Sequence, residues 1–259
     1  MCLIVIAWKA RDDLPLIVAA NRDEWRERPA EAARWWNDHP EILAGRDLKA
    51  GGTWMGVTRG GRFAAVTNFR DPSDKRSTAR SRGELVTQFL LSSEAPAAFL
   101  SALAGRAREY NGFNLIAGDG NELWYFGSRE GTARAIAPGV HGLSNHLLDE
   151  PWPKVVRARM AMEEALHQRD PAPLMFAALA DGEGAPDESL PSTGVGVAWE
   201  RRLASPLITG ADYGTRASTV VTLSAAGEIF CEERSLAEDG SVTNRATWRS
   251  PVSRRTATS

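Results

Sequence analysis

Two apolar runs open the chain, and each has the length and composition of a buried strand. Residues 2–8 form the first run, a polar turn follows at 11–13, and residues 14–20 form the second, which leads into Asn-Arg-Asp-Glu-Trp at 21–25. Short apolar runs bounded by turn residues are typical of strands. Two strands joined by a short loop pair as a hairpin, so we expect residues 21–25 to lie beside the start of the first strand.

Further strand pairs and helices follow in an order that predicts the fold class. Glycine-containing loops separate three more pairs of apolar runs, at 53–58 and 62–68, 114–117 and 122–126, and 219–223 and 228–231. A capping-box pattern at 81–84 predicts one helix start, and proline-led apolar patterns predict helices over 153–166 and 173–179. Antiparallel pairs interrupted by helices do not match alternating βαβ units. The sequence therefore predicts an α+β protein in which two antiparallel sheets carry helices on their outer faces.

Composition narrows the class of protein further. The 259 residues suit a single domain over 1–249, followed by a tail at 250–259 that we expect to be disordered. A net charge of −2 gives no footprint for nucleic acid. Two cysteines fit a reducing compartment, and the N-terminal run is too short for a membrane span, so we expect a cytoplasmic protein. The acidic, Gly/Pro/Ser-rich stretch at 181–196 is either a lid or a mobile loop, and its composition favours mobility.

Cys2 is the candidate for chemistry. Its small side chain favours removal of Met1, and a chain that then begins with Cys2 carries a thiol and a free α-amine, which is a nucleophile with its own base. Arg22, brought close by the hairpin, would favour the thiolate, and a carboxylate beside it would hold the amine. The alternative interpretation is that Cys2 is a small core residue that happens to fall second.

Motifs along almost the whole chain resemble those of the NRDE family, also called the transport and Golgi organisation protein 2 family. They are Met-Cys-Leu-Ile at 1–4, Asn-Arg-Asp-Glu at 21–24, Gly-Gly-Thr-Trp-Met-Gly-Val at 51–57, Thr-Asn-Phe-Arg at 67–70, Gly-Leu-Ser-Asn at 142–145, Pro-Trp-Pro-Lys at 151–154 and Tyr-Gly-Thr-Arg at 213–216. More remotely, the layout is similar to N-terminal nucleophile hydrolases that cleave amides, which implies a four-layer αββα sandwich.

That remote resemblance also implies a set of site residues. Carried over one at a time, they are Cys2, Arg22, Asp23, Asn68, Asn145 and Arg216. The hydrolases carry an Arg-Asn-any-Asp order where this chain has Asn-Arg-Asp-Glu, so either Asp23 or Glu24 could be the site carboxylate.

The expected function is hydrolysis of a carbon–nitrogen amide bond in a small, partly hydrophobic substrate. Cys2 would attack the carbonyl, and Asn68 and Asn145 would donate hydrogen bonds to the developing oxyanion. The alternative is a carrier without turnover, in which Trp35, Trp36 and Trp54 line an apolar channel for a hydrophobic ligand such as haem or an acyl lipid. The four histidines lack zinc-ligand spacing, and neither cysteine is in a haem-binding motif, so we expect no metal and no resident cofactor.

Overall fold

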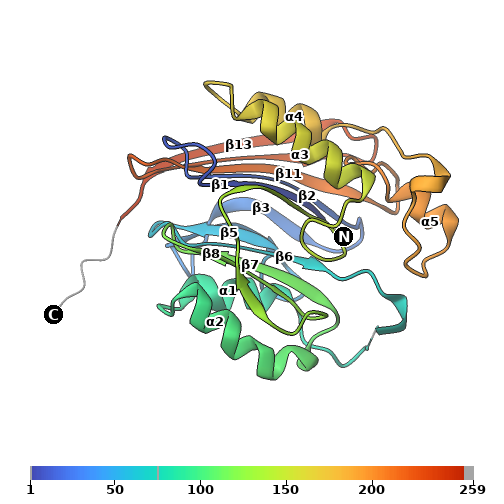
Figure 1. The fold of residues 1–259 in the computed structure, drawn as a ribbon, viewed down its shortest axis with the longest axis horizontal. Coiled ribbons are helices and arrows are strands. Elements are labelled where there is room, and N and C mark those ends of the chain that lie inside the picture. The colour runs from blue at the N-terminus through green and yellow to red at the C-terminus, as the bar shows by residue number, and fades with distance from the viewer. Residues whose placement is uncertain (1, 75, 254–259) are drawn as a thin grey trace.

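The computed structural model describes residues 2–74 and 76–253, and its strands form two antiparallel sheets that lie face to face (Figure 1). Strand order in the six-stranded sheet is β10 (Gly139–Leu143), β1 (Cys2–Trp8), β2 (Leu16–Trp25), β11 (Tyr213–Leu223), β12 (Glu228–Leu236) and β13 (Val242–Pro251). In the seven-stranded sheet it is β3 (Ala30–Trp35), β4 (Ile42–Asp47), β5 (Met55–Thr58), β6 (Phe63–Asn68), β7 (Phe113–Gly118), β8 (Leu123–Gly127) and β9 (Ala133–Ala135).

Helices cover the outer face of each sheet, which makes four layers. The six-stranded sheet is covered by α3 (Pro153–Ala165) and α4 (Ala172–Leu179), and the seven-stranded sheet by α1 (Gly83–Leu91) and α2 (Pro96–Leu103) (Figure 1). The short α5 (Val197–Arg202) lies at one end of the sandwich. Short 3₁₀ helices occur at Pro72–Asp74, Ala104–Glu109 and Asp187–Ser189. The predicted αββα architecture is therefore confirmed.

Successive side chains of β1 and β2 point to opposite faces of the six-stranded sheet, and both faces are apolar. Ile4 and Ile6 point into the core between the sheets, whereas Leu3 and Val5 point toward α3 and α4. Successive strand residues face opposite sides, so a strand covered on both faces reads as a continuous apolar run. That is why residues 2–8 carry no polar side chain.

The predicted hairpins are confirmed, and two details of the sequence interpretation are wrong. The helix α1 begins at Gly83 with Arg82 as its N-cap and no side-chain cap, so the capping box does not form. Glu84 instead accepts a hydrogen bond from the Tyr110 hydroxyl at 2.6 Å. The disordered tail was expected to begin at residue 250, but β13 continues through Ser250 to Pro251. Residues 254–259 of the expected tail lie outside the described residues.

The stretch 181–196, which was expected to be mobile, is held by several contacts. Arg157 donates to the carbonyl of Gly184 at 3.0 Å, and both the backbone and the hydroxyl of Thr193 donate to Glu200, at 2.8 and 2.7 Å. The stretch leads directly into α5, so these contacts fix one wall of the end of the sandwich.

Asn21, the first residue of the Asn-Arg-Asp-Glu motif, ties β2 to the layer above it. It is buried, its amide donates to the carbonyls of Leu179 at 2.8 Å and Pro206 at 2.9 Å, and its oxygen accepts from Ser218 at 2.6 Å. All of these groups would be left without a partner in a dry interior if the side chain were removed. Asn21 therefore has a structural role.

We predict that Asn21→Ala lowers the free energy of unfolding by about 1–3 kcal/mol, because it strands buried polar groups. Urea denaturation of this variant and of Asn244→Ala, a change at an exposed position on β13, measures the effect. Equal stabilities for the two variants would contradict the assigned role.

Candidate functional site

Cys2 is the first residue of β1 and lies directly opposite Arg22 on β2. Opposed residues in an antiparallel pair point to the same face, and alternation from Ile4 puts both side chains on the face between the two sheets. Cys2 is half-buried, and Ser144 donates a hydrogen bond to its carbonyl at 3.1 Å. The predicted hairpin thus does bring the Asn-Arg-Asp-Glu motif beside the thiol.

The environment of the thiol has opposing effects on its ionisation. Burial raises the pKa of Cys2, and the negative charge of Asp23 acts in the same direction. The positive charge of Arg22 and a backbone hydrogen bond from Asp23 lower that pKa. Burial has the largest effect, so the pKa of Cys2 lies above its ordinary value, and the charge of Arg22 only reduces this increase.

Arg22 is held by an aromatic ring and a distant carboxylate. Its guanidinium lies 4.3 Å from the centre of the Trp54 ring and 3.8 Å from the Glu24 carboxylate. A cation over an aromatic face is attracted by the ring electrons, so Trp54 helps to hold Arg22 in the pocket. Glu24 is half-buried and is also 3.8 Å from Arg28. Its carboxylate therefore pairs with the two arginines and not with Cys2.

Asp23, the other carboxylate of the motif, points to the helix-covered side of the sheet. It is buried, and its carboxylate accepts a hydrogen bond from the Thr215 hydroxyl at 2.8 Å. Burial raises the pKa of Asp23, while the positive charge of Lys154 and the Thr215 bond lower it. Lys154 is the buried counter-charge that makes an ionised Asp23 tolerable at this position.

Lys154 belongs to a buried charge network that the sequence interpretation did not assign. It is the second residue of α3, it is only 1% exposed, and its ammonium has no hydrogen-bond partner among the described residues. Burial lowers the pKa of Lys154 to about 8, and the charge of Asp23 opposes this shift. Nearby, Arg70 forms a buried ion pair of 2.6 Å with Glu200 of α5.

Some of these residues could have been suspected from the sequence. Lys154 and Arg70 lie in the Pro-Trp-Pro-Lys and Thr-Asn-Phe-Arg motifs, so the positions were noted without a role. Glu200 lies outside every motif, and only the fold brings α5 against the end of β6.

The two predicted asparagines lie together but are used differently. Asn68 ends β6 and lines the pocket that contains Cys2, and its side-chain amide has no hydrogen-bond partner among the described residues. Asn145 is fully buried, and its amide donates to the carbonyl of Asn68 at 3.1 Å. Asn145 therefore supports Asn68 from behind the pocket wall.

A chain of hydrogen bonds connects this end of the two sheets. The Tyr125 hydroxyl donates to Asn114 at 2.7 Å, the Asn114 amide donates to Thr67 at 3.1 Å, and Thr67 donates to the carbonyl of Ser144 at 2.7 Å. Because Ser144 also bonds to Cys2, the chain couples the position of the thiol to the opposite sheet.

Arg216 sits at a bulge where the β2–β11 register shifts between Thr215 and Ala217. Its guanidinium donates to the carbonyls of Trp25, Arg26 and Arg28, at 3.1, 3.1 and 3.2 Å. The structure thus places Arg216 under the loop that follows β2, where it fixes the backbone beyond the motif, and no contact with Cys2 is observed among the described residues.

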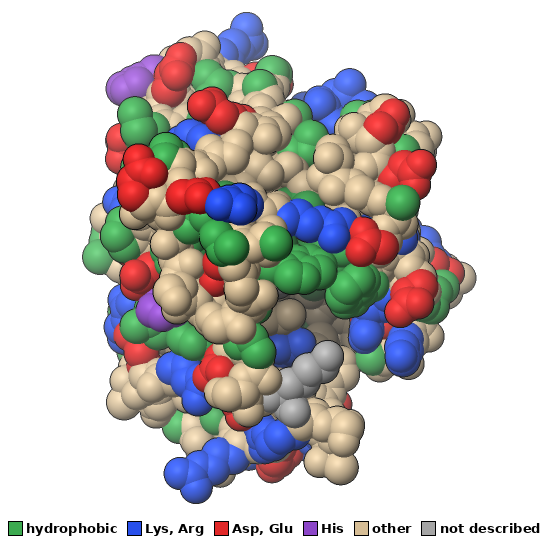
Figure 2. All heavy atoms as spheres, turned by 90° about the vertical axis from the view of Figure 1, so that its right-hand side faces the viewer, with side chains coloured by type: hydrophobic (Ala, Val, Ile, Leu, Met, Phe, Trp, Pro, Cys, Tyr) green, Lys and Arg blue, Asp and Glu red, His purple; other side chains and the backbone are tan. Residues whose placement is uncertain are grey.

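Cys2 opens onto a pocket of about 510 Å³ at the end of the sandwich. Arg22, Asp23 and Asn68 line it together with Trp54 and the segment 76–83. Figure 2 shows this end of the molecule as a hollow, with hydrophobic side chains on one rim and Lys and Arg side chains around it. The site is therefore a surface pocket that a small molecule can enter.

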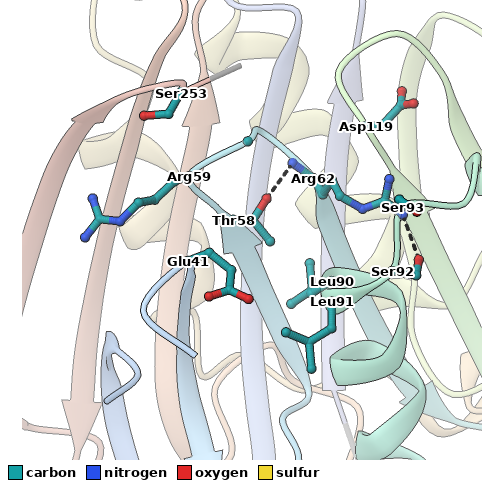
Figure 3. A pocket seen from close by; sticks show the side chains of 11 residues that line it. Glu41, Thr58, Arg59, Arg62, Leu90, Leu91, Ser92, Ser93, Asp119 and Ser253 are labelled. Atoms are coloured by element: carbon teal, nitrogen blue, oxygen red, sulfur yellow. Dashed lines mark hydrogen bonds between the residues drawn. The ribbon is translucent and has the colours of Figure 1, made fainter. Parts of the chain in front are cut away.

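A second pocket, of about 370 Å³, lies at the opposite end of β6 (Figure 3). It is lined by Glu41, Thr58, Arg59, Arg62 and neighbouring residues, and contains no cysteine. Arg62 is already engaged there, because it donates to the carbonyls of Phe89 and Glu94 at the end of α1. Of these two pockets, the one at Cys2 contains a thiol, so we take it as the candidate site.

The three tryptophans proposed to form one channel are separated, so that prediction is wrong. Trp36 is buried in the core between the seven-stranded sheet and its helices, and its indole donates to Ala44 at 3.0 Å. Trp35 packs against the core between the sheets, under the guanidinium of Arg59. Trp54 alone of the three lines the Cys2 pocket.

Two absences in the described part of the chain bear on the expected partners. There, no group of three or more His, Cys, Asp or Glu side chains is arranged to hold a metal ion. Nor does any helix of residues 2–74 and 76–253 combine the length and apolar character that crossing a bilayer requires.

Fold and site together define an αββα protein with a cysteine at the start of a central strand, flanked by Arg22 and Asp23. Sequence comparison supplies the family. The family model described as Transport and Golgi organisation 2 matches residues 1–238, so the chain belongs to that family, and the resemblance noted from its motifs is confirmed.

Its relatives span the same length. The chain is 37% identical to the Transport and Golgi organization protein 2 homolog of Bos taurus over 264 residues, covering 91% of this chain and 93% of the relative. It is 34% identical to the homolog of Mus musculus, with the same coverage.

Among solved structures, the chain is similar to a mutant of a conjugated bile acid hydrolase from Clostridium perfringens, with 8% identity, a TM-score of 0.49 and 98% of each chain covered. It is also similar to an N-acylethanolamine-hydrolyzing acid amidase ortholog from Caenorhabditis elegans, with 9% identity, a TM-score of 0.40 and coverage of 85% of this chain and 92% of the other.

We predict that iodoacetamide at neutral pH labels Cys2 and spares Cys231, because burial in the core raises the pKa of Cys231 and closes it to reagents. Arg22→Ala should slow labelling of Cys2 by about tenfold, the effect expected on losing one nearby positive charge. Peptide mass spectrometry measures both rates.

The matched control is Arg59→Ala, which removes another arginine stacked on a tryptophan, 3.8 Å above the Trp35 ring. Its labelling rate should equal that of the unmodified chain. Equal labelling of the two cysteines would reduce Cys2 to a packed core residue.

We also predict a pH dependence of stability caused by Lys154. Its pKa of about 8 in the folded protein lies below its ordinary value of 10.5, so between these values the unfolded chain binds the additional proton. Stability therefore rises with pH through this window, and the destabilisation by the buried ammonium is fully present below about pH 8.

Urea denaturation of the unmodified chain and of Lys154→Met, from pH 7.5 to 10, measures the effect as a difference. The free energy of unfolding of the unmodified chain should gain about 2–3 kcal/mol relative to the variant over the titration. Parallel profiles would show that Lys154 does not titrate in this way.

Proposed function

We propose that this protein is an N-terminal cysteine hydrolase that cleaves a carbon–nitrogen amide bond of a small, partly hydrophobic substrate. The observation that carries the proposal is the pairing of Cys2 with Arg22 at the mouth of a pocket, with the buried carboxylate of Asp23 one residue further along β2.

The strand register supports a carboxylate beside the α-amine that would act as the base. Since β1 and β2 run antiparallel, the residue that follows Arg22 lies beside the start of β1, where the amine of a chain beginning with Cys2 would stand. Asp23 is thus the site carboxylate in this proposal, and Glu24 is the partner of the arginines. Lys154 acts as a positioning residue, because its charge keeps Asp23 ionised.

The reaction follows from these groups. The Cys2 amine takes the proton of the thiol, and the thiolate sulfur attacks the carbonyl carbon. The tetrahedral intermediate collapses to a thioester as the C–N bond breaks, and the leaving amine receives the proton. Water then hydrolyses the thioester, which releases the acid and restores the thiol.

Oxyanion stabilisation is assigned to Asn68, which lines the pocket and whose side-chain amide has no hydrogen-bond partner in the part of the chain that the structure describes. Asn145 acts through Asn68, because its amide is already bonded to the Asn68 carbonyl. This assignment changes the expectation that both asparagines donate directly.

We predict that Cys2→Ala abolishes turnover of N-acyl substrates and that Asn68→Ala lowers kcat by about 10²–10³, the usual effect of losing one oxyanion donor. Steady-state kinetics on a panel of N-acyl amines and N-acyl amino acids measures both effects. Asn244→Ala, on the exposed edge strand, serves as the control and should leave kcat unchanged.

A panel without any Cys2-dependent turnover would contradict the hydrolase. Stoichiometric binding of a hydrophobic ligand under the same conditions would then favour the carrier, in which the pocket persists without chemistry.

A further inference from the structure

The Cys2 pocket continues into a second hollow, and together they form one groove. This neighbouring hollow, of about 640 Å³, is distinct from the pocket at the opposite end of β6 and shares Asn68, Arg82 and Asn111 with the Cys2 pocket. It extends between the loop after β6 and the start of α5. A ligand that reaches Cys2 can therefore also lie along the second hollow.

Aromatic side chains form one wall of this extension. Trp25 and Trp199 line it, and their ring centres are 5.9 Å apart in an edge-to-face arrangement. Tyr213 packs against both rings, at 5.2 and 5.7 Å. Trp25 remains 44% exposed, which leaves an open apolar surface at the end of the groove. Such a wall suits the hydrocarbon part of a ligand.

Arg82 stands at the junction of the two hollows. It is half-buried at the N-cap of α1, and one guanidinium nitrogen donates to the Gly112 carbonyl at 3.1 Å. Burial lowers its pKa, while the negative charges of Glu24 and the Cys2 thiolate act in the opposite direction. The guanidinium is thus close enough to sense the charge at the nucleophile.

Arg82 differs from the other arginines of the Cys2 pocket in having no carboxylate at ion-pair distance among the described residues. Arg80 pairs with Glu84 and Glu109, each at 2.7 Å, and Arg28 pairs with Asp47 at 2.6 Å. Arg22 and Arg76 have carboxylates at 3.8 and 3.7 Å. Within the described residues, no carboxylate lies within 4 Å of Arg82. A half-buried guanidinium that is not paired with a carboxylate favours an anionic ligand group.

The acidic side chains on the other hollow do not compete for this role. Asp71 and Asp74 line it, but both are bound by Arg129, at 2.6 and 3.1 Å. The groove therefore presents an apolar wall at one end, a positive charge in the middle and the thiol at the other end.

We infer that Arg82 selects a substrate carboxylate, so that the groove takes N-acyl amino acids in preference to neutral N-acyl amines. The acyl chain lies on Trp25 and Trp199, the amide carbonyl reaches Cys2, and the short amine side folds back from Cys2 so that its carboxylate pairs with Arg82 at the junction. The inference rests on the proposed hydrolase function for the placement of the amide, whereas the anion selection by Arg82 can be measured without turnover.

The experiment uses the full chain with Cys2→Ala, which binds without hydrolysing. Titration calorimetry compares N-dodecanoylglycine with its neutral isostere N-dodecanoylglycinamide, both below their aggregation concentrations. The anionic ligand should bind about 10- to 100-fold more tightly, the range for a hydrogen bond to a charged group.

Adding Arg82→Gln should remove that preference, and Arg82→Lys should keep part of it, because the positive charge remains. The matched control is Arg59→Gln, which alters an arginine outside the groove, 3.8 Å from the centre of the Trp35 ring, and should leave the preference intact. Equal affinity for the two ligands, no binding of either, or an unchanged preference in Arg82→Gln would overturn the inference.

The outcomes separate this inference from the proposed function. An Arg82-dependent preference together with Cys2-dependent cleavage of N-dodecanoylglycine supports both. The same preference without cleavage by the chain that retains Cys2 contradicts the hydrolase and supports anion selection. Cleavage of both ligands at equal kcat/KM contradicts the selection by Arg82 alone.

Discussion

The register between β1 and β2 is the constraint on which the site depends. Pairing Cys2 with Arg22 puts both side chains between the sheets and leaves Asn21 and Asp23 on the helix-covered face. A slip by one residue would exchange the two faces and move the thiol away from the pocket. Apolar alternation from Ile4 onward prevents such a slip, because it would also move the core side chains out of the core.

The buried charges around this register are costly, and their arrangement suggests why they are there. Each ion removed from water costs several kcal/mol unless it is paired and hydrogen-bonded. Here Asp23 is balanced by Lys154 and Thr215, and Arg70 is balanced by Glu200. The first set fixes a carboxylate at the start of β1, and the second fastens α5 across the end of the sandwich. Both sets lie at the end of the sandwich where the pocket opens.

The layered fold was predictable from the sequence because apolar periodicity and glycine turns are local signals. The same holds for the proximity of Cys2 and Arg22, which follows from one hairpin. Arg82 and Glu200 were not predictable, because their roles depend on contacts between segments far apart in the chain. The tryptophans were misassigned for a similar reason: Trp35, the last residue of β3, and Trp36, which follows it, point to opposite sides of the sheet and pack against different cores.

The central claim is that Cys2 acts with its own free amine, which requires a chain that begins at Cys2. Intact-mass spectrometry of protein purified from its native cells tests this most directly, with the same sample assayed for amide hydrolysis. The account predicts a mass that lacks one methionine and an unblocked N-terminal Cys2. Active protein that retains Met1 would contradict it.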